Sequence, residues 1–468
     1  MHVRWNRKDF DPDYLVAHLE GSRIPADPAT DRDAHFGQDL FFEDTLAVFE
    51  RALFFSEAVP ERDKRVLFGR ALFAAANLGE LTPGTLIGEV NRRAQEFARR
   101  ENKEYVLATS FSFAHFATLP ESTEISGCQI SFGSGLPDNL REGHEEVKER
   151  MRRYVFGDYP AIHGFSSYCA VWVSVRGRSE YEAAERALAA LDLLRGIWNL
   201  TLNRRRWTRM SGQRRRPVNE VLLGPVHSLH YPDGTLAAET GWYEYDYVEP
   251  TRSGEPQKRW QLVRRNEGNV RTLLDRSNYR GEIEEAVRRY ARALDSREWD
   301  SAYVRLWGLL EDLTGTEPGD GHEVTVRRAA FQYADPERRL HAQVLAHLKD
   351  YRNGSVHGGE GSDDIEAYLY RLKRYVEDKL VFHLQNSPSF MDMGEVARFF
   401  DHPPDQAGID RKIADLSRNA TDIEERVRLA RLAHDFRTAP ADQDAGGDEG
   451  ADGTRTEAGN KTEGGSAG

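Results

Sequence analysis

Cysteine and long apolar runs are both scarce in this sequence. Its 468 residues include two cysteines, Cys128 and Cys169, which lie far apart in strand-like apolar segments. This argues against a disulfide framework or a cysteine-rich zinc site, so we expect two thiols buried in a core. No apolar stretch reaches the ~20 residues of a membrane-spanning helix, and the N-terminus lacks the apolar region of a signal peptide. We therefore expect a cytoplasmic protein without a membrane segment.

Several well-known catalytic motifs are absent as well. The sequence contains no phosphate-cradling glycine loop, no serine nucleophile elbow and no HExxH zinc motif. His341 and His347 are six residues apart, which is not the four-residue spacing of a helical metal pair. His227 and His230 form no recognisable zinc set either. The sequence thus predicts neither a metal site nor a cofactor.

The chain carries an excess of negative charge, with one strongly basic cluster. A net charge of −13 argues against a protein that coats nucleic acid along its whole surface. The basic cluster fits either a nucleic-acid patch, with an indole for base stacking, or a solvated segment whose arginines pair with the chain's many carboxylates. The candidate nucleic-acid-binding residues are Arg204, Arg205, Arg206, Trp207, Arg209, Arg214, Arg215 and Arg216.

The composition is that of a globular protein, and the first 270 residues mix helical and strand patterns. Hydrophobic residues make up 39% of the chain, and its length favours two domains plus accessory segments. Runs rich in β-branched and aromatic residues at 104–113, 127–134 and 165–177 predict strands of one sheet. An alanine- and leucine-rich run predicts a helix over 180–203. This half is predicted to be an α+β domain.

From about residue 278 onward the pattern is helical. Amphipathic runs predict four helices, which with short to moderate connections indicate a bundle; they cover residues 280–294, 298–315, 336–353 and 362–385. Residues 409–437 predict a further helix that packs on the bundle or on a second subunit. Residues 438–468 contain no aromatic and almost no aliphatic side chain beyond alanine, so they are predicted to be disordered.

The third helix of this unit ends in a pair of residues with chemical potential, Arg352 and His357. On a continuous helix, five residues turn through about 500°, which leaves the two side chains about 140° apart. They can converge within one subunit only if the helix ends between them, and Gly354 permits such an end. We therefore expect a pair displayed where the helix unwinds.

Such a pair suits RNA cleavage without a metal. A histidine with a pKa near 6.5 can take a proton from a ribose 2′-hydroxyl or give one to a leaving 5′-oxygen. A forked guanidinium matches phosphate oxygens and stabilises negative charge that develops on the phosphorus. DNA lacks the 2′-hydroxyl and would be spared.

Residues Asn278 to Gln385, about a quarter of the chain, resemble a HEPN domain, and within that superfamily the Apea-like HEPN family of prokaryotic defence proteins. The residues that carry this resemblance are Leu306, Trp307, Leu310, Glu311, Leu348, Tyr351, Arg352, Asn353, His357 and Gly358. The resemblance implies an up-and-down helical bundle that dimerises so that Arg-Asn-x3-His motifs from both subunits line one cleft. It implies a metal-independent endoribonuclease, with Arg352 and His357 as the catalytic pair and Asn353 as a polar helper.

The resemblance also leaves an alternative open. Many HEPN proteins act in abortive infection or as toxins, which implies anti-phage defence here, but others bind without cutting. The alternative is a non-catalytic HEPN module that binds nucleotide or RNA or supports assembly. Trp307 and Leu310 are expected in the bundle core. Glu311 either orients Arg352 as a neighbouring carboxylate or faces solvent.

Taken together, the sequence predicts an α+β chain in four parts. An N-terminal mixed helix and sheet domain precedes an all-α up-and-down HEPN bundle, a helical extension and a disordered tail; the ranges are 1–270, 277–390, 391–437 and 438–468. By analogy with two-part defence proteins, the first part is expected to sense a phage-derived trigger. The expected partners of the second are an RNA substrate and a second copy of the chain.

Overall fold

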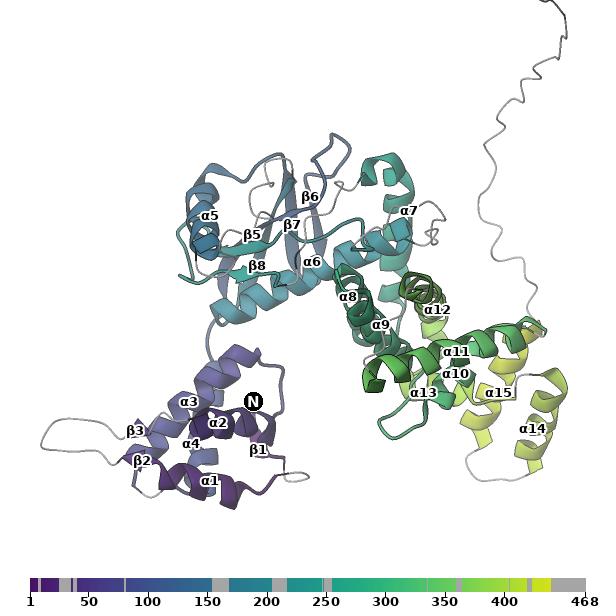
Figure 1. Cartoon of the computed structure of the whole chain (residues 1–468), viewed down its shortest axis with the longest axis horizontal. Helices are drawn as coiled ribbons and strands as arrows, with labels where there is room; N and C mark the ends of the chain where they lie inside the picture. Colours follow the sequence, from purple (N-terminus) through teal and green to yellow (C-terminus); the bar gives the residue numbers. More distant parts are fainter. Residues whose placement is uncertain are drawn as a thin grey trace, which may run out of the picture.

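The structure of the chain is a computed structural model (Figure 1). It describes residues 1–6, 10–24, 35–36, 40–79, 81–153, 168–203, 217–245, 247, 255–334, 336–358, 364–403, 405–418 and 423–438. The fold is α+β as predicted, with an antiparallel sheet in the first half and helices throughout the second. None of the helices in these ranges combines the length and the apolar character that a membrane span requires. The predicted tail lies outside these ranges except for Thr438.

The first hundred residues form a small helical unit with a core of its own. Phe49, Phe68 and Leu72 pack at its centre. Its helices are α1 (Pro12–Gly21), α2 (Leu40–Ala52), α3 (Glu61–Asn77) and α4 (Pro83–Ala98). Two short antiparallel pairs complete it: β1 (Val3–Trp5) with β4 (Leu53–Phe55), and β2 (Arg23–Ile24) with β3 (His35–Phe36).

A six-stranded antiparallel sheet follows, in the order β10-β9-β5-β8-β7-β6. Its strands are β5 (Lys103–Phe111), β6 (Ser122–Ile125), β7 (Cys128–Gly133), β8 (Cys169–Gly177), β9 (Val226–His230) and β10 (Trp242–Tyr243). Helix α6 (Glu180–Asn203) packs on β5, β7 and β8, while α5 (Asp138–Met151) packs on β9. Cys128 and Cys169 are free, buried thiols in this sheet, as predicted.

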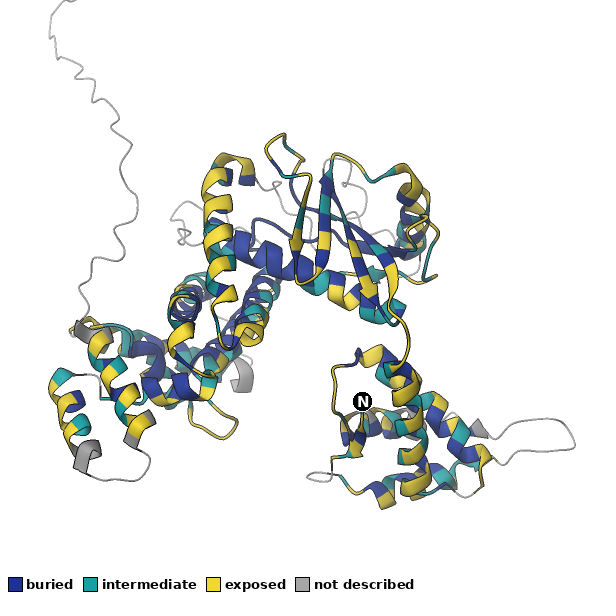
Figure 2. Cartoon of the chain, turned by 180° about the vertical axis from the view of Figure 1, so that it is seen from behind, coloured by how far each residue is buried: buried dark blue, intermediate teal, exposed yellow. Residues whose placement is uncertain are grey.

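Helix α6 coincides with its predicted range. Its alanines and leucines favour the helical state, and the Ser179 hydroxyl accepts a hydrogen bond from the Glu182 backbone N–H at 3.0 Å, which caps its first turn. The helix is largely buried because both the sheet and the helical half cover it (Figure 2). It is therefore the element that joins the two halves.

The second half consists of helices. They are η4 (Pro256–Arg259), α7 (Trp260–Asp275), α8 (Arg280–Asp295), α9 (Trp299–Leu313), α10 (His322–Ala330), α11 (Glu337–Gly358), α12 (Ile365–Asn386), η5 (Ser387–Ser389), α13 (Met393–Phe400), α14 (Gln406–Arg418) and α15 (Ile423–Thr438). Helix α9 packs against α8 and α12, and α11 packs mainly on α10. The stretch 409–437, predicted as one helix, contains parts of two, α14 and α15.

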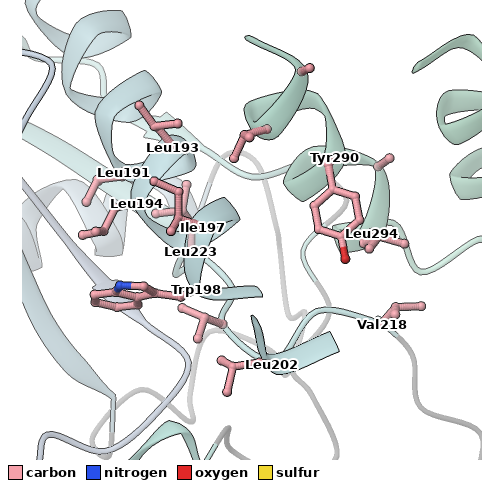
Figure 3. Packing of buried hydrophobic residues seen from close by; sticks show 14 of the residues in the cluster. Leu191, Leu193, Leu194, Ile197, Trp198, Leu202, Val218, Leu223, Tyr290 and Leu294 are labelled. Atoms are coloured by element: carbon pink, nitrogen blue, oxygen red, sulfur yellow. The ribbon is translucent and has the colours of Figure 1, made fainter. Parts of the chain in front are cut away.

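One large core runs from the sheet into the bundle. Figure 3 shows Ile197 and Trp198 of α6 together with Tyr290 and Leu294 of α8, which all belong to one buried cluster. The two helices approach closely at Gly196, where an added Cβ would lie 2.8 Å from the Val287 carbonyl oxygen. The predicted division between residues 270 and 277 therefore falls inside a shared core, whereas the first hundred residues have a separate one.

Candidate functional site

The segment of α11 that precedes the Arg-Asn motif is tied to α9. The Tyr303 hydroxyl donates a hydrogen bond to the Leu348 carbonyl at 2.6 Å, and the Tyr351 hydroxyl donates to Asp300 Oδ1 at 2.7 Å. The two tyrosine rings also meet edge to face, with centroids 5.1 Å apart. Buried Leu345 and Leu348 add apolar contacts on the same side. These contacts fix the backbone from which Arg352 projects.

Arg352 is half-buried and has no carboxylate partner among the residues that the structure describes. Its Nη1 donates to Asn353 Oδ1 at a long 3.4 Å, and its Nε is buried without a hydrogen-bond partner. None of the ion pairs in the described part of the chain includes Arg352. By contrast, Arg328 donates to both oxygens of Asp401, at 2.9 and 2.8 Å. The Arg352 guanidinium therefore has donors that an anion could use.

The predicted end of the helix between Arg352 and His357 is wrong. Helix α11 continues through Gly354 and ends at Gly358. Glycine permits unwinding but does not force it, since its cost in a helix is only about 1 kcal/mol. The Cα–Cβ directions of the two residues are thus about 140° apart on one continuous helix. The side chain of His357 lies outside the described residues.

Glu311 does not occupy the predicted position beside Arg352. Its Oε1 accepts hydrogen bonds from Trp307 Nε1 and from His322 Nδ1, both at 2.8 Å. No bond among the described residues joins Glu311 to Arg352. Trp307 and Leu310 are fully buried in the bundle, as predicted. The carboxylate therefore stabilises the end of α9 and the start of α10.

The basic cluster at residues 204–216, with Trp207, lies outside the described residues, but the positions that flank it are described. Helix α6 ends at Asn203, whose Nδ2 donates to Asn219 Oδ1 at 2.9 Å. Asn219 in turn donates to Asp295 Oδ1 at 2.7 Å. Both flanks of the cluster are thus fixed where the sheet domain meets α8.

That junction contains buried charges that sequence patterns did not reveal. Arg195 has no exposed side-chain surface; its Nε donates to Asp192 and its Nη1 to Asp295, each at 2.8 Å. Asp192 is three positions from Arg195, a helical spacing that could have indicated the pair. Asp295 is far from Arg195 in sequence, so no local sequence pattern indicates this second partner.

A second buried pair lies in α12. Lys373 Nζ contacts Glu377 Oε1 at 2.8 Å and donates to the Asn203 carbonyl at 2.9 Å. The Tyr290 hydroxyl also donates to Glu377. Burial raises the pKa of Glu377, although Lys373 opposes that shift. This pair thus connects the bundle to the end of α6.

Comparisons of this chain with family models, with curated proteins and with solved structures find no match.

Proposed function

We propose that this chain is a metal-independent endoribonuclease. Arg352 and Asn353 bind the scissile phosphate, and His357 transfers protons. The observation that supports this proposal is the half-buried Arg352, whose guanidinium has a partnerless Nε and no described ion pair. A guanidinium held by the protein without a carboxylate matches a phosphate in shape and charge.

The proposed site is composite and requires two copies of the chain. Because α11 is continuous, the Cα–Cβ directions of Arg352 and His357 of one copy are about 140° apart. A two-fold axis beside the end of α11 brings Arg352 of one copy toward His357 of the other. Each dimer then contains two equivalent sites, and a monomer contains none.

The chemistry follows from these residue types. One imidazole accepts the proton of the ribose 2′-hydroxyl as its oxygen attacks the phosphorus and the bond to the 5′-oxygen breaks. The imidazolium formed in this way returns the proton to the leaving 5′-oxygen, and the products are a 2′,3′-cyclic phosphate and a 5′-hydroxyl. Arg352 stabilises the extra negative charge on the non-bridging oxygens. The proposed biological context is anti-phage defence, with residues 1–270 as the sensor, and it rests on the HEPN resemblance alone.

Mixing two inactive variants tests the composite site. Purified full-length chain is incubated with RNA in EDTA, alongside Arg352→Ala, His357→Ala and, as a matched control on the same helix, Arg339→Ala. Each motif variant is expected to lose at least about 100-fold in cleavage rate, and the control to retain it. After co-refolding of the two motif variants, half of the dimers are mixed and hold one intact site of two, so about a quarter of the activity returns.

Two outcomes would contradict the proposal. If the co-refolded variants stay inactive while each still dimerises, the site is not shared between copies. If the unaltered chain binds RNA but never cuts it, with or without phage extract, the non-catalytic binding or assembly function holds instead.

A further inference from the structure

A cavity of about 220 Å³ lies in the sheet domain, far in sequence from α11. It opens between α5 and the ends of β5, β8 and β9. Four of its lining residues, Arg141, His144, Glu145 and Lys148, come from α5. Their spacing of three, four and seven places them on one face of that helix. The helix therefore presents a continuous polar edge to the cavity.

This edge carries two cations, Arg141 and Lys148, and one carboxylate, Glu145, in an otherwise acidic protein. Arg141 and Lys148 each form an ion pair on α5, at 2.7 Å with Asp138 and 2.8 Å with Glu145. Those carboxylates are 91% and 60% exposed, so the pairs are surface pairs of small energy. An anion in the cavity can compete with them for the two cations.

A chain of three side chains determines which ring nitrogen of His144 carries the proton. His230 Nδ1 lies 3.0 Å from the Gly234 carbonyl and must donate to it. Burial lowers the pKa of His230, so the ring is neutral and its Nε2 accepts from the Ser228 hydroxyl at 2.8 Å. Ser228 Oγ then accepts from His144 Nδ1 at 2.7 Å. His144 thus holds its proton on Nδ1.

The other nitrogen of His144 is consequently an acceptor. Burial, with Lys148 nearby, lowers the pKa of His144 to about 3, so the ring stays neutral at physiological pH. Its Nε2 has no hydrogen-bond partner among the described residues and carries a lone pair. A ligand that contacts Nε2 must therefore supply an O–H or N–H. The hydroxyl residues Ser110 and Ser134 also line the cavity.

We propose that this cavity binds a phosphate ester of a small hydroxylated molecule, with the phosphate at Arg141 and Lys148 and a hydroxyl or amino group donating to His144 Nε2. A phosphate can take both cations at once. The serine hydroxyls can exchange hydrogen bonds with a sugar. Nucleoside monophosphates and sugar phosphates share this chemistry. The site is separate from α11 and does not rest on the proposed RNA cleavage.

Calorimetric titration of the full chain tests the site with four probes: AMP, ribose 5-phosphate, inorganic phosphate and adenosine. The two esters are expected to bind at least about tenfold tighter than inorganic phosphate or adenosine, since only they engage both the cations and His144. Preference for AMP identifies a nucleotide site, and equal affinities identify a sugar-phosphate site. If neither ester binds, or if inorganic phosphate binds as tightly, the proposal fails.

Two double variants of α5 locate the binding. Arg141→Gln with Lys148→Gln is expected to weaken ester binding at least about tenfold. Arg150→Gln with Arg152→Gln removes the same charge from the end and the C-cap of this helix, outside the cavity, and should change the affinity less than twofold. Equal losses of affinity in the two double variants would show that net charge alone weakens binding, and the proposed site would be wrong. His357→Ala should retain ester binding, so failure of RNA cleavage leaves this test unaffected.

Discussion

Arg195 and Arg352 both project from long helices, but their surroundings are opposite. Arg195 is fully buried and donates to two carboxylates, Asp192 and Asp295. Arg352 is half-buried, has a partnerless Nε and forms one long bond to the neighbouring Asn353. The Nη2 of Arg195 also lacks a hydrogen bond, but it lies 2.7 Å from both carboxylates and has no exposed surface, whereas the half-buried Arg352 is accessible to an anion. The same residue type is thus structural at the junction and a candidate for binding at the end of α11.

The contrast extends to the regions around them. At the junction, Lys373 and Glu377 are almost fully buried and bonded to each other. Such pairs are expensive to break because the remaining charge stays buried without a partner. At the end of α11, the tyrosine contacts hold the helix but leave Arg352 out of the hydrogen-bond network. Substitutions in the two regions should therefore separate stability from activity.

The largest expected effect is on stability, from Arg195→Met. Removing this guanidinium takes one partner from each of Asp192 and Asp295, which keep Arg292 and Asn219, so the free energy of unfolding should fall by about 3 kcal/mol. Urea unfolding followed by circular dichroism measures it. Arg186→Met, at an exposed position of the same helix, is the control and should change stability little. An unchanged urea midpoint for Arg195→Met would contradict the structural role assigned to Arg195.

Arg352→Ala should lower the activity and leave the stability nearly unchanged. RNA cleavage is expected to fall by at least about 100-fold, equivalent to about 2.7 kcal/mol, while the free energy of unfolding changes by less than about 1 kcal/mol. Arg352→Lys keeps the charge but loses the fork, so it should recover only part of the rate. Cleavage rates and urea unfolding on the same preparations check both. A loss of stability as large as that of Arg195→Met would assign Arg352 a structural role.

The next effect is a pH dependence of stability at a buried histidine. His383 is fully buried, between the Tyr279 hydroxyl and the Leu313 carbonyl, and burial lowers its pKa to about 4. The unfolded chain, with a pKa near 6.5, binds more protons, so stability falls as the pH drops below about 6.5. Between pH 7 and pH 5.5 this histidine should contribute a loss of about 1 kcal/mol.

Urea unfolding across that pH range measures the slope of the free energy of unfolding against pH. His383→Gln should reduce the slope by this amount, whereas Arg352→Ala should leave it unchanged because a guanidinium does not titrate there. An identical slope in the unaltered chain and in His383→Gln would contradict the assignment of a neutral buried imidazole.

Local patterns predicted the elements that local interactions determine. Helix α6 matches its predicted range because alanine, leucine and the Ser179 cap all favour it. Strands β5, β7 and β8 follow from their β-branched and aromatic runs. The sequence reasoning singled out neither α7 nor α10, although α7 carries Trp260, Val263, Val270 and Leu274 at helical spacing; α10 has only nine residues. Tertiary packing decides whether such segments form helices.

Long-range contacts explain what sequence reasoning missed at the site. The bond between Arg195 and Asp295 joins residues 100 positions apart, and charged residues in a helix are ordinarily expected at the surface. The chain of His144, Ser228 and His230 likewise joins α5 to a strand far along the sequence. Gly354 is the opposite case, because a glycine permits a helix to end but α11 continues through it.

The smallest expected effect tests the predicted role of Glu311. Its carboxylate bonds Trp307 and His322 rather than Arg352. Glu311→Gln keeps an acceptor for the indole and weakens only the contact with the half-exposed His322, so stability should fall by less than about 1 kcal/mol. RNA cleavage should be unchanged within twofold, because nothing that holds Arg352 is altered. Cleavage that falls as far as in Arg352→Ala would show that Glu311 does position the Arg352 guanidinium in the assembled site. The surroundings of Arg352 would then differ less from those of Arg195 than they do in the single chain.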